Sequence, residues 1–572
     1  MQAQEKMKII HRTSTYEGLP ASTAIGMALF ESLGLGRLID QRCRYDPTKR
    51  ILSPGMVTKI LLGPTFNIRN KYPLYLVNKA YSNAPLDRLC GPNVGVDDIT
   101  DYSLARGLDT LFDANLTELF KECSDTAVKA LGLESHVLHM DSTDISVDCI
   151  EHLPDKEGAS VPLRNGHPKD KRTDLLQYEL QIVTDSDSII RYMKPYSGNV
   201  GDSVMDRNTI RDLIDIFSEK EREGITIVGD CKLATADNIE MMIDSGFGFV
   251  SKCAANFKDD GFERARKLSV EKKMHSCDRR GLWMSDCDLD VRTSTKRVEK
   301  LRFVAFRWDC KVDRKIGEVR ERVSERISKI VKESSKKRFS TEKEALMYVK
   351  DLVGEDEPFR MKVRTGHHIV AELRRTSWWE VELEFEVSEK RIRRQAELEC
   401  TAVLVTNLSR SERRFDSKQD SEEVPSNPVS RRNGDPVDGS GKRIPVTDEE
   451  ILRIYNREYK VERSFALMKS GLGMNTVYLQ KPSRENAMMF VICIGVLLSN
   501  IAEAMFRRAD TRLEGKPMTM YRLSHELQTT LVIYSRSDNS LSLLGPPEVT
   551  DRFFEYTDTL GINPQLLFGY RQ

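Results

Sequence analysis

The 572-residue sequence lacks several patterns that would assign it to a class of protein at once. Its 11 cysteines include no CxxC pair and no Cys/His spacing suited to zinc, which is typical of reduced thiols in a cytosolic protein. Lysine plus arginine and aspartate plus glutamate number 88 each, so the formal net charge is zero. Any binding of nucleic acid must therefore come from local basic patches, because a global positive field is absent.

Long apolar runs are also missing. The first residues, MQAQEKMKIIHRTS, do not contain the apolar core of a signal peptide. The most hydrophobic run, 487–498, has about a dozen residues, too few to cross a bilayer, and it predicts a buried helix. We therefore expect no membrane role and a cytoplasmic location. The length favours roughly three domains.

Residues 1–130 predict a helical N-terminal domain, because apolar residues at helical spacing alternate with Gly/Pro turns. The helical patterns cover 24–35, 54–62 and 101–120, the last with a candidate cap at Thr100 or Asp101. A domain of this kind either contacts DNA or only packs against the rest of the chain, and the residues leave both readings open.

From residue 135 the pattern changes to a mixed α/β layer. Strands are predicted at 136–141, 175–183, 188–196, 225–230 and 247–251, and helices at 206–217 and 235–244. The second and third strands are expected to form an antiparallel hairpin. Asp141 and Asp230 are expected to end their strands, where open α/β sheets place their chemistry.

Residues 257–400 predict a β-rich insertion with a helical arm. Strand patterns cover 282–291, 298–308 and 381–387, and a charged amphipathic helix covers 315–331. Residues 401–447 predict a returning strand and a disordered linker, because 409–442 is rich in Ser, Arg, Asp, Pro and Gly. Residues 448–510 predict two helices, and 511–572 a helical C-terminal region without a chemical motif.

The stretch YNREYKVERSFALMKS, residues 455–470, contains neither Gly nor Pro and predicts a helix. Residues seven apart drift only about 20° around a helix, so Tyr455, Glu462 and Lys469 are expected to share one face. An apolar stripe runs beside that face: Val461, Phe465 and Met468. A carboxylate held over packed side chains, between groups that bind phosphate, is typical of an acidic metal site.

Five stretches occur in an order that resembles bacterial and archaeal insertion-sequence transposases of the DDE type, whose third-acid helix reads Y-x2-R-x3-E-x6-K. They are HMDSTDI, GHPKDKRTDLLQ, GNVGDS, IVGDCKLATADNI and YNREYKVERSFALMKS. The resemblance implies an α/β fold, in which residues 131–256 and 448–510 form an RNase H-like mixed sheet core. The β-rich insertion and the helical N-terminal domain would be attached to this core.

Carried over residue by residue, the resemblance implies that Asp141, Asp230 and Glu462 are the catalytic acids and the ligands of two Mg²⁺ or Mn²⁺ ions. Asp144 and Asp202 lie near these acids in the motifs. They are interpreted as caps or hydrogen-bond acceptors, with metal binding as the less favoured alternative.

The same resemblance implies DNA contacts by Tyr455 and Lys469. Position 458, where the signature has Arg, holds Glu458, and Arg457 precedes it, so Glu458 is a competing metal ligand and Arg457 a candidate phosphate contact. Two loop residues, Lys169 and Arg172, are either surface charges or contacts to the DNA backbone.

Two further features of the insertion leave alternatives open. Trp378 and Trp379 either stack on a DNA base or belong to the subdomain core. The basic run KRIRRQ, 390–395, either binds phosphate or pairs with neighbouring Glu residues.

The function implied is metal-dependent cleavage at the terminal inverted repeats of an insertion sequence, followed by strand transfer into target DNA. The resemblance further implies a homodimer in the DNA complex and a prokaryotic cytoplasm, with the protein on the nucleoid when bound. Two alternatives remain: an RNase H-like nuclease that does not join strands, and a domesticated, catalytically inactive DNA-binding protein.

Overall fold

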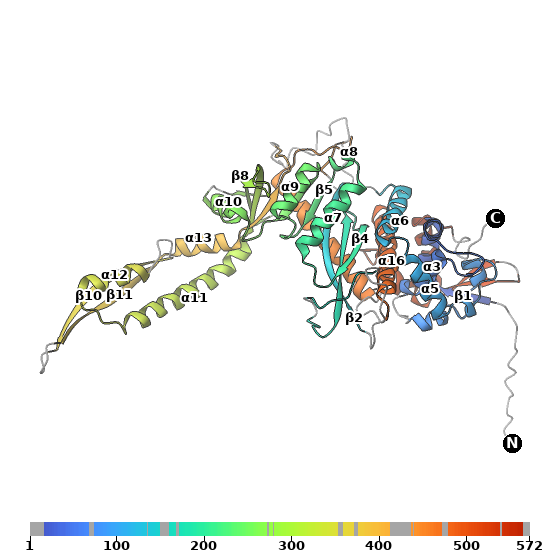
Figure 1. Ribbon diagram of the computed structural model, residues 1–572, viewed down its shortest axis with the longest axis horizontal. Coiled ribbons are helices and arrows are strands. Elements are labelled where there is room, and N and C mark those ends of the chain that lie inside the picture. Colours follow the sequence, from blue (N-terminus) through green and yellow to red (C-terminus); the bar gives the residue numbers. More distant parts are fainter. Residues whose placement is uncertain are drawn as a thin grey trace, which may run out of the picture. The chain divides into compact units, whose positions relative to one another are not determined.

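A computed structural model of the chain divides into two compact units (Figure 1). The first unit comprises Met1–Gly229, Ser430–Lys442 and Asn456–Gln572, and the second Asp230–Val429 and Arg443–Tyr455. The structure describes residues 16–67, 74–133, 135–148, 160–166, 171–271, 274–277, 280–352, 358–370, 376–411, 436–438, 440–471, 479–537 and 540–563. The fold class is mixed α/β with a large mixed sheet and many helices, which confirms the predicted class.

The strands of the first unit follow the order β4-β3-β2-β5. Their bounds are Val137–Val147 for β2, Leu176–Asp185 for β3, Ile190–Ser197 for β4 and Thr226–Gly229 for β5. β2 and β4 both run antiparallel to β3, which confirms the predicted hairpin, and β5 runs parallel to β2.

One predicted strand boundary is wrong. Asp141 does not end β2, because the strand continues for six more residues to Val147 and stays paired with β3 throughout. The β-branched side chains of Thr143, Ile145 and Val147 explain the extension, since they suit a pleated, buried surface.

The helices of the first unit confirm the helical patterns at its N-terminus. They are α1 (Ala21–Ser32), α2 (Leu35–Arg42), α3 (Pro54–Leu62), α4 (Leu86–Leu89), α5 (Asp101–Phe112), α6 (Leu116–Leu131), α7 (Asp202–Ile216) and α8 (Glu219–Arg222). Thr100 caps α5, its hydroxyl accepting the N–H of Ser103 at 3.0 Å. The pattern at 101–120 belongs to two helices, because Asn115 has a left-handed backbone that ends one and starts the next.

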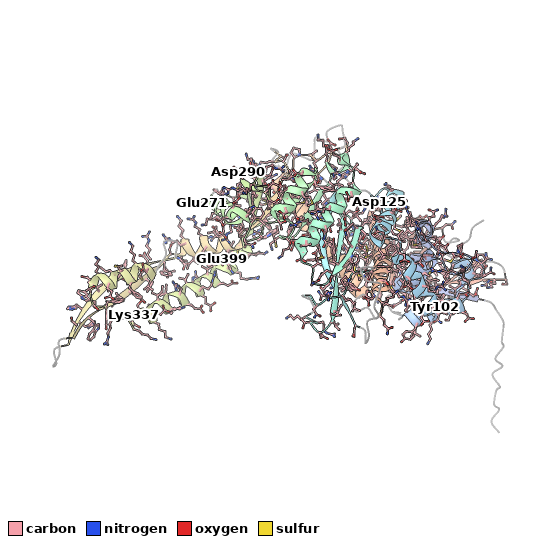
Figure 2. The ribbon with its side chains drawn as sticks, in the orientation of Figure 1. Tyr102, Asp125, Glu271, Asp290, Lys337 and Glu399 are labelled. Carbon is pink, nitrogen blue, oxygen red and sulfur yellow. The ribbon has the colours of Figure 1, made fainter. Side chains whose placement is uncertain are left out.

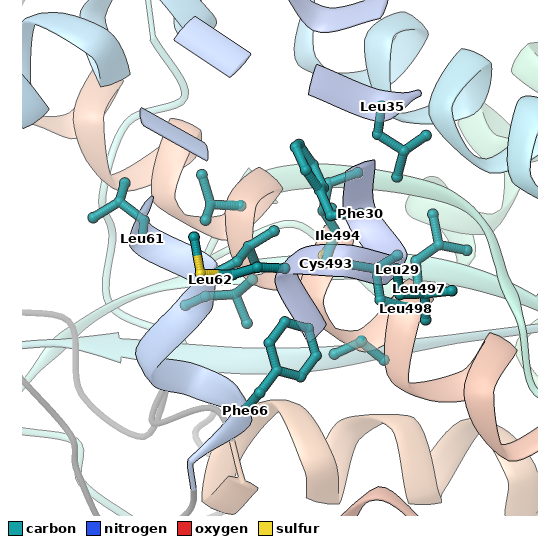
Figure 3. Packing of buried hydrophobic residues seen from close by; sticks show 14 of the residues in the cluster. Leu29, Phe30, Leu35, Leu61, Leu62, Phe66, Cys493, Ile494, Leu497 and Leu498 are labelled. Atoms are coloured by element: carbon teal, nitrogen blue, oxygen red, sulfur yellow. The ribbon is translucent and has the colours of Figure 1, made fainter. Parts of the chain in front are cut away.

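The core of the first unit is built around α16 (Pro482–Arg508), which lies among α3, α5 and α6 (Figure 1). In Figure 3, Phe30 of the N-terminal segment lies beside Ile494 of α16, and Leu61 and Phe66 belong to the same hydrophobic core. This helix is long and apolar enough to span a membrane, but 94% of its most apolar window is buried inside the protein. It is therefore a core helix, consistent with a soluble protein, and the N-terminal helices share one hydrophobic core with β2, β3 and β4.

The C-terminal region contains strands as well as helices. After α16 come β13 (Arg512–Leu513), β14 (Lys516–Pro517), α17 (Met520–Glu526), β15 (Leu531–Ser535), β16 (Ser540–Leu544) and α18 (Pro547–Thr559). β15 lies between β16 and β1 (Tyr16–Pro20) in a three-stranded sheet. The prediction of a helical region without strands is therefore wrong, because these strands have only two or five residues and give no clear alternating pattern.

The strands of the second unit follow the order β6-β12-β9-β8-β7. Their bounds are Gly248–Lys252, Ala402–Thr406, Val298–Trp308, Leu282–Arg292 and His275–Ser276. The helices α9 (Ala236–Asp244) and α10 (Gly261–Glu271) accompany them. The predicted strands at 247–251, 282–291, 298–308 and 401–407 are confirmed.

The remaining part of the insertion has its own small core. It contains α11 (Asp309–Ser334), α12 (Glu342–Leu352), β10 (Phe359–Val370), β11 (Thr376–Val387) and α13 (Glu389–Cys400). Val319 and Val323 of α11 pack against Ile392 and Ala396 of α13, while charged side chains such as Glu399 cover the outside (Figure 2). The helical arm and the strand at 381–387 are confirmed, and this part contains more helix than its pattern indicated. The predicted disordered linker lies largely outside the described residues, at 412–435 and 439.

Candidate active site

The third-acid segment is helical but not uniform. It consists of α14 (Asp448–Tyr455), a 3₁₀ turn (Asn456–Glu458), α15 (Tyr459–Ala466) and a π-helical turn (Leu467–Gly471). The prediction of one uninterrupted α-helix is therefore wrong, and the spacing of Tyr455, Glu462 and Lys469 no longer fixes a common face. π-helical turns occur frequently at functional sites, and Lys469 lies in this one.

The apolar stripe of α15 faces the sheet. Val461, Phe465 and Met468 are buried, and they belong to the same hydrophobic core as Ile182 of β3. α15 also contacts β2 and β3 directly. Glu462 points away from this stripe and is exposed, so the packing presents its carboxylate to solvent.

Asp141 lies on the sheet face that α15 covers. It is paired across the ladder with Ile182, and residues directly opposite one another in an antiparallel pair lie on the same face. Asp141 is half-buried, and its carboxylate accepts the backbone N–H of Ser142 at 2.8 Å. The side chain of the first acid, Asp141, and the helix that contains the third acid, Glu462, therefore lie on the same face of the sheet formed by β2 and β3.

The end of β5 lies beside Asp141. The parallel ladder pairs His139 with Val228, so Gly229, the last residue of β5, is level with Met140. Asp230 is the next residue of the chain, at the carboxyl end of β5, as predicted. Its side chain is exposed, and its carboxylate accepts the N–H of Lys232 at 2.7 Å.

A lysine of the third-acid segment is bound to β2. The ammonium of Lys469 lies 3.3 Å from a carboxylate oxygen of Asp144, and these residues are 325 positions apart in the chain. The Asp144 side chain is only 4% exposed, whereas that of Lys469 is 26% exposed. This contact brings the end of the signature to within three residues of Asp141.

The opposite face of β2 and β3 carries polar contacts to α7. The hydroxyl of Ser142 donates to Asp202 at 3.3 Å, and the amide of Gln181 donates to Asp206 at 3.1 Å. Asp202 is the first residue of α7. It is therefore a hydrogen-bond acceptor beside the first acid.

Two glycines bring the second and third motifs together. A Cβ on Gly198 would lie 2.5 Å from Cγ and 2.6 Å from the carbonyl oxygen of Gln177, and one on Gly166 would lie 2.1 Å from the carbonyl oxygen of Gly198. Gln177 is fully buried and donates to Glu179 at 3.0 Å. Only glycine fits at both places, so this junction fixes both motifs against β3.

The predicted DNA-contact residues fall in different places. Arg457 reaches the β3–β4 turn, where its guanidinium lies 3.5 Å from the hydroxyl of Ser186. Arg172 is exposed and makes two bonds of 2.8 Å to Asp174. Tyr455 is the last residue of α14 and belongs to the second unit. Lys169 and the side chain of Glu458 lie outside the described residues.

The donor set suits a divalent ion in its chemistry. Asp141, Asp230 and Glu462 offer carboxylate oxygens, the ligands that Mg²⁺ and Mn²⁺ prefer. Across the described ranges, no three Asp, Glu, His or Cys side chains are grouped closely enough to hold a metal ion. Among those same residues, none makes a hydrogen bond or ion pair with the Glu462 carboxylate, so this ligand is available.

Sequence reasoning missed a buried charge cluster in the second unit. Arg302 of β9 is 5% exposed, and its guanidinium bonds to Asp448, the first residue of α14, and to Asp286 of β8. Burial, and then the charge of Asp286, raise the pKa of Asp448. This cluster holds the start of the third-acid segment on the inserted strands. No local pattern signals it, because Asp448 is 146 residues from Arg302 in the chain.

Trp378 and the arginines of the basic run in the insertion contact other side chains of the protein. The Trp378 ring stacks with His368 at 5.7 Å between centroids, and the Arg338 guanidinium lies 4.3 Å from the centre of that ring. In the basic run at 390–395, Arg393 pairs with Glu397 and Arg394 with Glu271. These contacts favour a structural role for both features.

Comparison with known proteins covers only the N-terminal part. Residues 23–125, from α1 into α6, match a family described as a domain of unknown function (DUF4277). No curated protein matches the chain. The family assigns no activity, so a function must be argued from the site.

Proposed function

We propose that the chain is the transposase of an insertion sequence, which cuts DNA at the ends of its element and joins the freed ends to target DNA. The observation that carries this proposal is the Lys469–Asp144 contact, because it joins the end of the signature segment to β2, the strand that contains Asp141. The motif order of the sequence supports the same conclusion.

The strand arrangement of the first unit supports an RNase H-like core. Antiparallel β4, β3 and β2 are followed by a parallel β5, one acid lies in β2, and a second follows β5. The helix bearing Glu462 packs on the sheet face of Asp141. The proposed function requires the three carboxylates to share the metal ions.

In this function Asp141, Asp230 and Glu462 would hold two Mg²⁺ or Mn²⁺ ions. Such ions, when bound, activate the attacking oxygen and neutralise charge on the scissile phosphate. Lys469 would bind a phosphate oxygen of the DNA through its N–H donors, and Tyr455 would donate a hydrogen bond to the DNA backbone. Arg457 is bonded to Ser186 in the β3–β4 turn. A phosphate contact by Arg457 would therefore lie beside that turn.

The partners in this proposal are the terminal inverted repeats, the target DNA and a second copy of the chain. Because each copy would hold one end of the element, a dimer would act on both ends. The protein would work on the nucleoid of a prokaryotic cell.

The test is a strand-transfer assay with duplexes that end in the labelled terminal repeats found beside the gene. Full-length protein with Mg²⁺ should release 3′ ends and then join them to a target plasmid. Cleavage without joined product would instead identify a nuclease, and binding without cleavage an inactive DNA-binding protein.

A further inference from the structure

The Asp144 carboxylate is a deeply buried acid in the strand that contains Asp141. It lies in β2 with its side chain 4% exposed, and its partner Lys469 comes from the π-helical turn that ends the signature segment. Ladder alternation places it on the same sheet face as Ser142, with Glu179 directly opposite. A buried carboxylate among polar groups requires a counter-charge, and Lys469 supplies it.

The strand edge at this position is open on one side. Within the described part of the chain, β2 pairs with β3 from Leu138 to Val147, but with β5 only from Val137 to His139. Beyond that point no described strand covers the other edge of β2. The Lys469 side chain can therefore reach Asp144 from α15 while part of it stays in contact with solvent.

We propose that Asp144 is a positioning residue, which fixes the Lys469 ammonium at the open edge of β2 so that a DNA phosphate binds the remaining N–H donors of that lysine. This inference rests on the proposed function. It assigns Asp144 a role in DNA binding, and the Lys469–Asp144 ion pair is expected to persist when DNA is bound.

The physical reason is the cost of separating the pair. If Lys469 left Asp144 to follow a phosphate, a charged carboxylate would stay buried without a partner, which is strongly unfavourable. An ammonium has three N–H donors, so it can bond Asp144 and a phosphate oxygen together. A lysine already held in place also loses less rotamer freedom when DNA binds.

The same contact argues against Asp144 as a metal ligand. An ammonium 3.3 Å from its carboxylate would repel a divalent ion at the same oxygens.

The test is a double-mutant cycle on full-length protein, with DNA affinity measured on a duplex carrying the terminal repeat, without divalent ions. Asp144→Asn and Lys469→Met should each weaken binding by about tenfold, and the double variant should bind no worse than Lys469→Met alone. Each single variant should also reduce the slope of the logarithm of the binding constant against the logarithm of the salt concentration, by about the amount expected for one phosphate contact.

The matched control is Asp212→Asn, which breaks the 2.6 Å Lys194–Asp212 pair between β4 and α7 in the same unit. It should leave DNA affinity unchanged. If Asp144→Asn does not fold, Asp144→Glu keeps the charge but shifts the carboxylate by one methylene, and it should still weaken binding.

Three results would overturn the inference: additive losses in the cycle, wild-type affinity in a folded Asp144 variant, or a higher Mg²⁺ requirement for cleavage with DNA affinity unchanged. In each of these cases the wild type still cuts its DNA, so the proposed function stands. A wild type that neither binds nor cuts the terminal repeats overturns the proposed function, and this inference with it.

Discussion

The ammonium of Lys469 lies 3.3 Å from the carboxylate of Asp144, which joins the end of the third-acid segment to the strand that bears the first acid. The contact closes a loop of more than three hundred residues. Both partners belong to the first unit, so the juxtaposition is a property of one folded body.

The first prediction concerns the stability that this pair provides. Lys469→Met leaves Asp144 buried without its counter-charge, and because Lys469 is partly exposed we expect a loss of about 1–3 kcal/mol in the free energy of unfolding. Urea unfolding measures it. Lys194→Met, at the more exposed pair with Asp212, should cost less than about 1 kcal/mol. Equal losses of stability in Lys469→Met and Lys194→Met would contradict the conclusion that Asp144 is the more deeply buried of the two acids.

The second prediction concerns the glycine junction of the motifs. Gly198→Ala forces a Cβ to within 2.6 Å of the Gln177 backbone and should destabilise the protein by about 1–3 kcal/mol. Gly201→Ala is the matched control in the same motif, because no atom lies within 4 Å of its added Cβ and its φ is −78°. Gly198→Ala should unfold at a clearly lower temperature than Gly201→Ala. Similar midpoints would show that the contact between Gly198 and Gln177 can accommodate a Cβ atom.

The third prediction concerns pH. Burial raises the pKa of Asp185, at the end of β3, from 3.8 to about 7. Since the folded value lies above the unfolded one, this group's contribution to stability is full below pH 3.8 and is lost as the pH rises towards 7. Asp185→Asn, which cannot ionise, should therefore gain stability relative to wild type across that window. A difference between the two proteins that stays constant from pH 4 to about pH 8 would contradict the shift.

The fourth prediction concerns the charge cluster at the start of α14. Arg302→Met leaves the largely buried carboxylate of Asp448 without its guanidinium partner, although Arg410 still pairs with Asp286, and should destabilise this region by about 3 kcal/mol. Hydrogen exchange in α14 should rise accordingly. Arg297→Met, in the turn of the same hairpin and 42% exposed, is the control and should change exchange little. Unchanged protection of α14 in Arg302→Met would show that the cluster does not hold the helix.

Local patterns in the sequence were sufficient for most elements. The strands at 282–291 and 298–308 were predicted from their strand-like patterns, and α3 was predicted with its bounds because apolar residues recur at helical spacing over 54–62. The full length of β2 was missed, since Asp141, Ser142 and Asp144 interrupt its apolar pattern.

The arrangement of the site could be predicted only in part. The carboxyl end of β5 at Asp230 and the packed stripe of α15 follow from short stretches of sequence. The 3₁₀ and π turns that flank α15 do not, because the residues there favour helix in general and do not signal the type of turn. The pairs of Lys469 with Asp144 and of Arg302 with Asp448 join distant segments, and only the folded chain reveals them.

The most direct measurement is Mg²⁺-dependent cleavage of the terminal-repeat duplex by wild type and by Asp141→Asn, Asp230→Asn and Glu462→Gln, with Glu458→Gln measured alongside. Each of the three acid variants should bind the duplex as wild type does but cut it more than about a hundredfold more slowly. A loss of that size exceeds what is expected when a residue that only supports a metal ligand is replaced. Glu458→Gln should retain cleavage. If Glu458→Gln alone abolishes cutting, or if any of the three acid variants cuts at the wild-type rate, the proposed site is wrong.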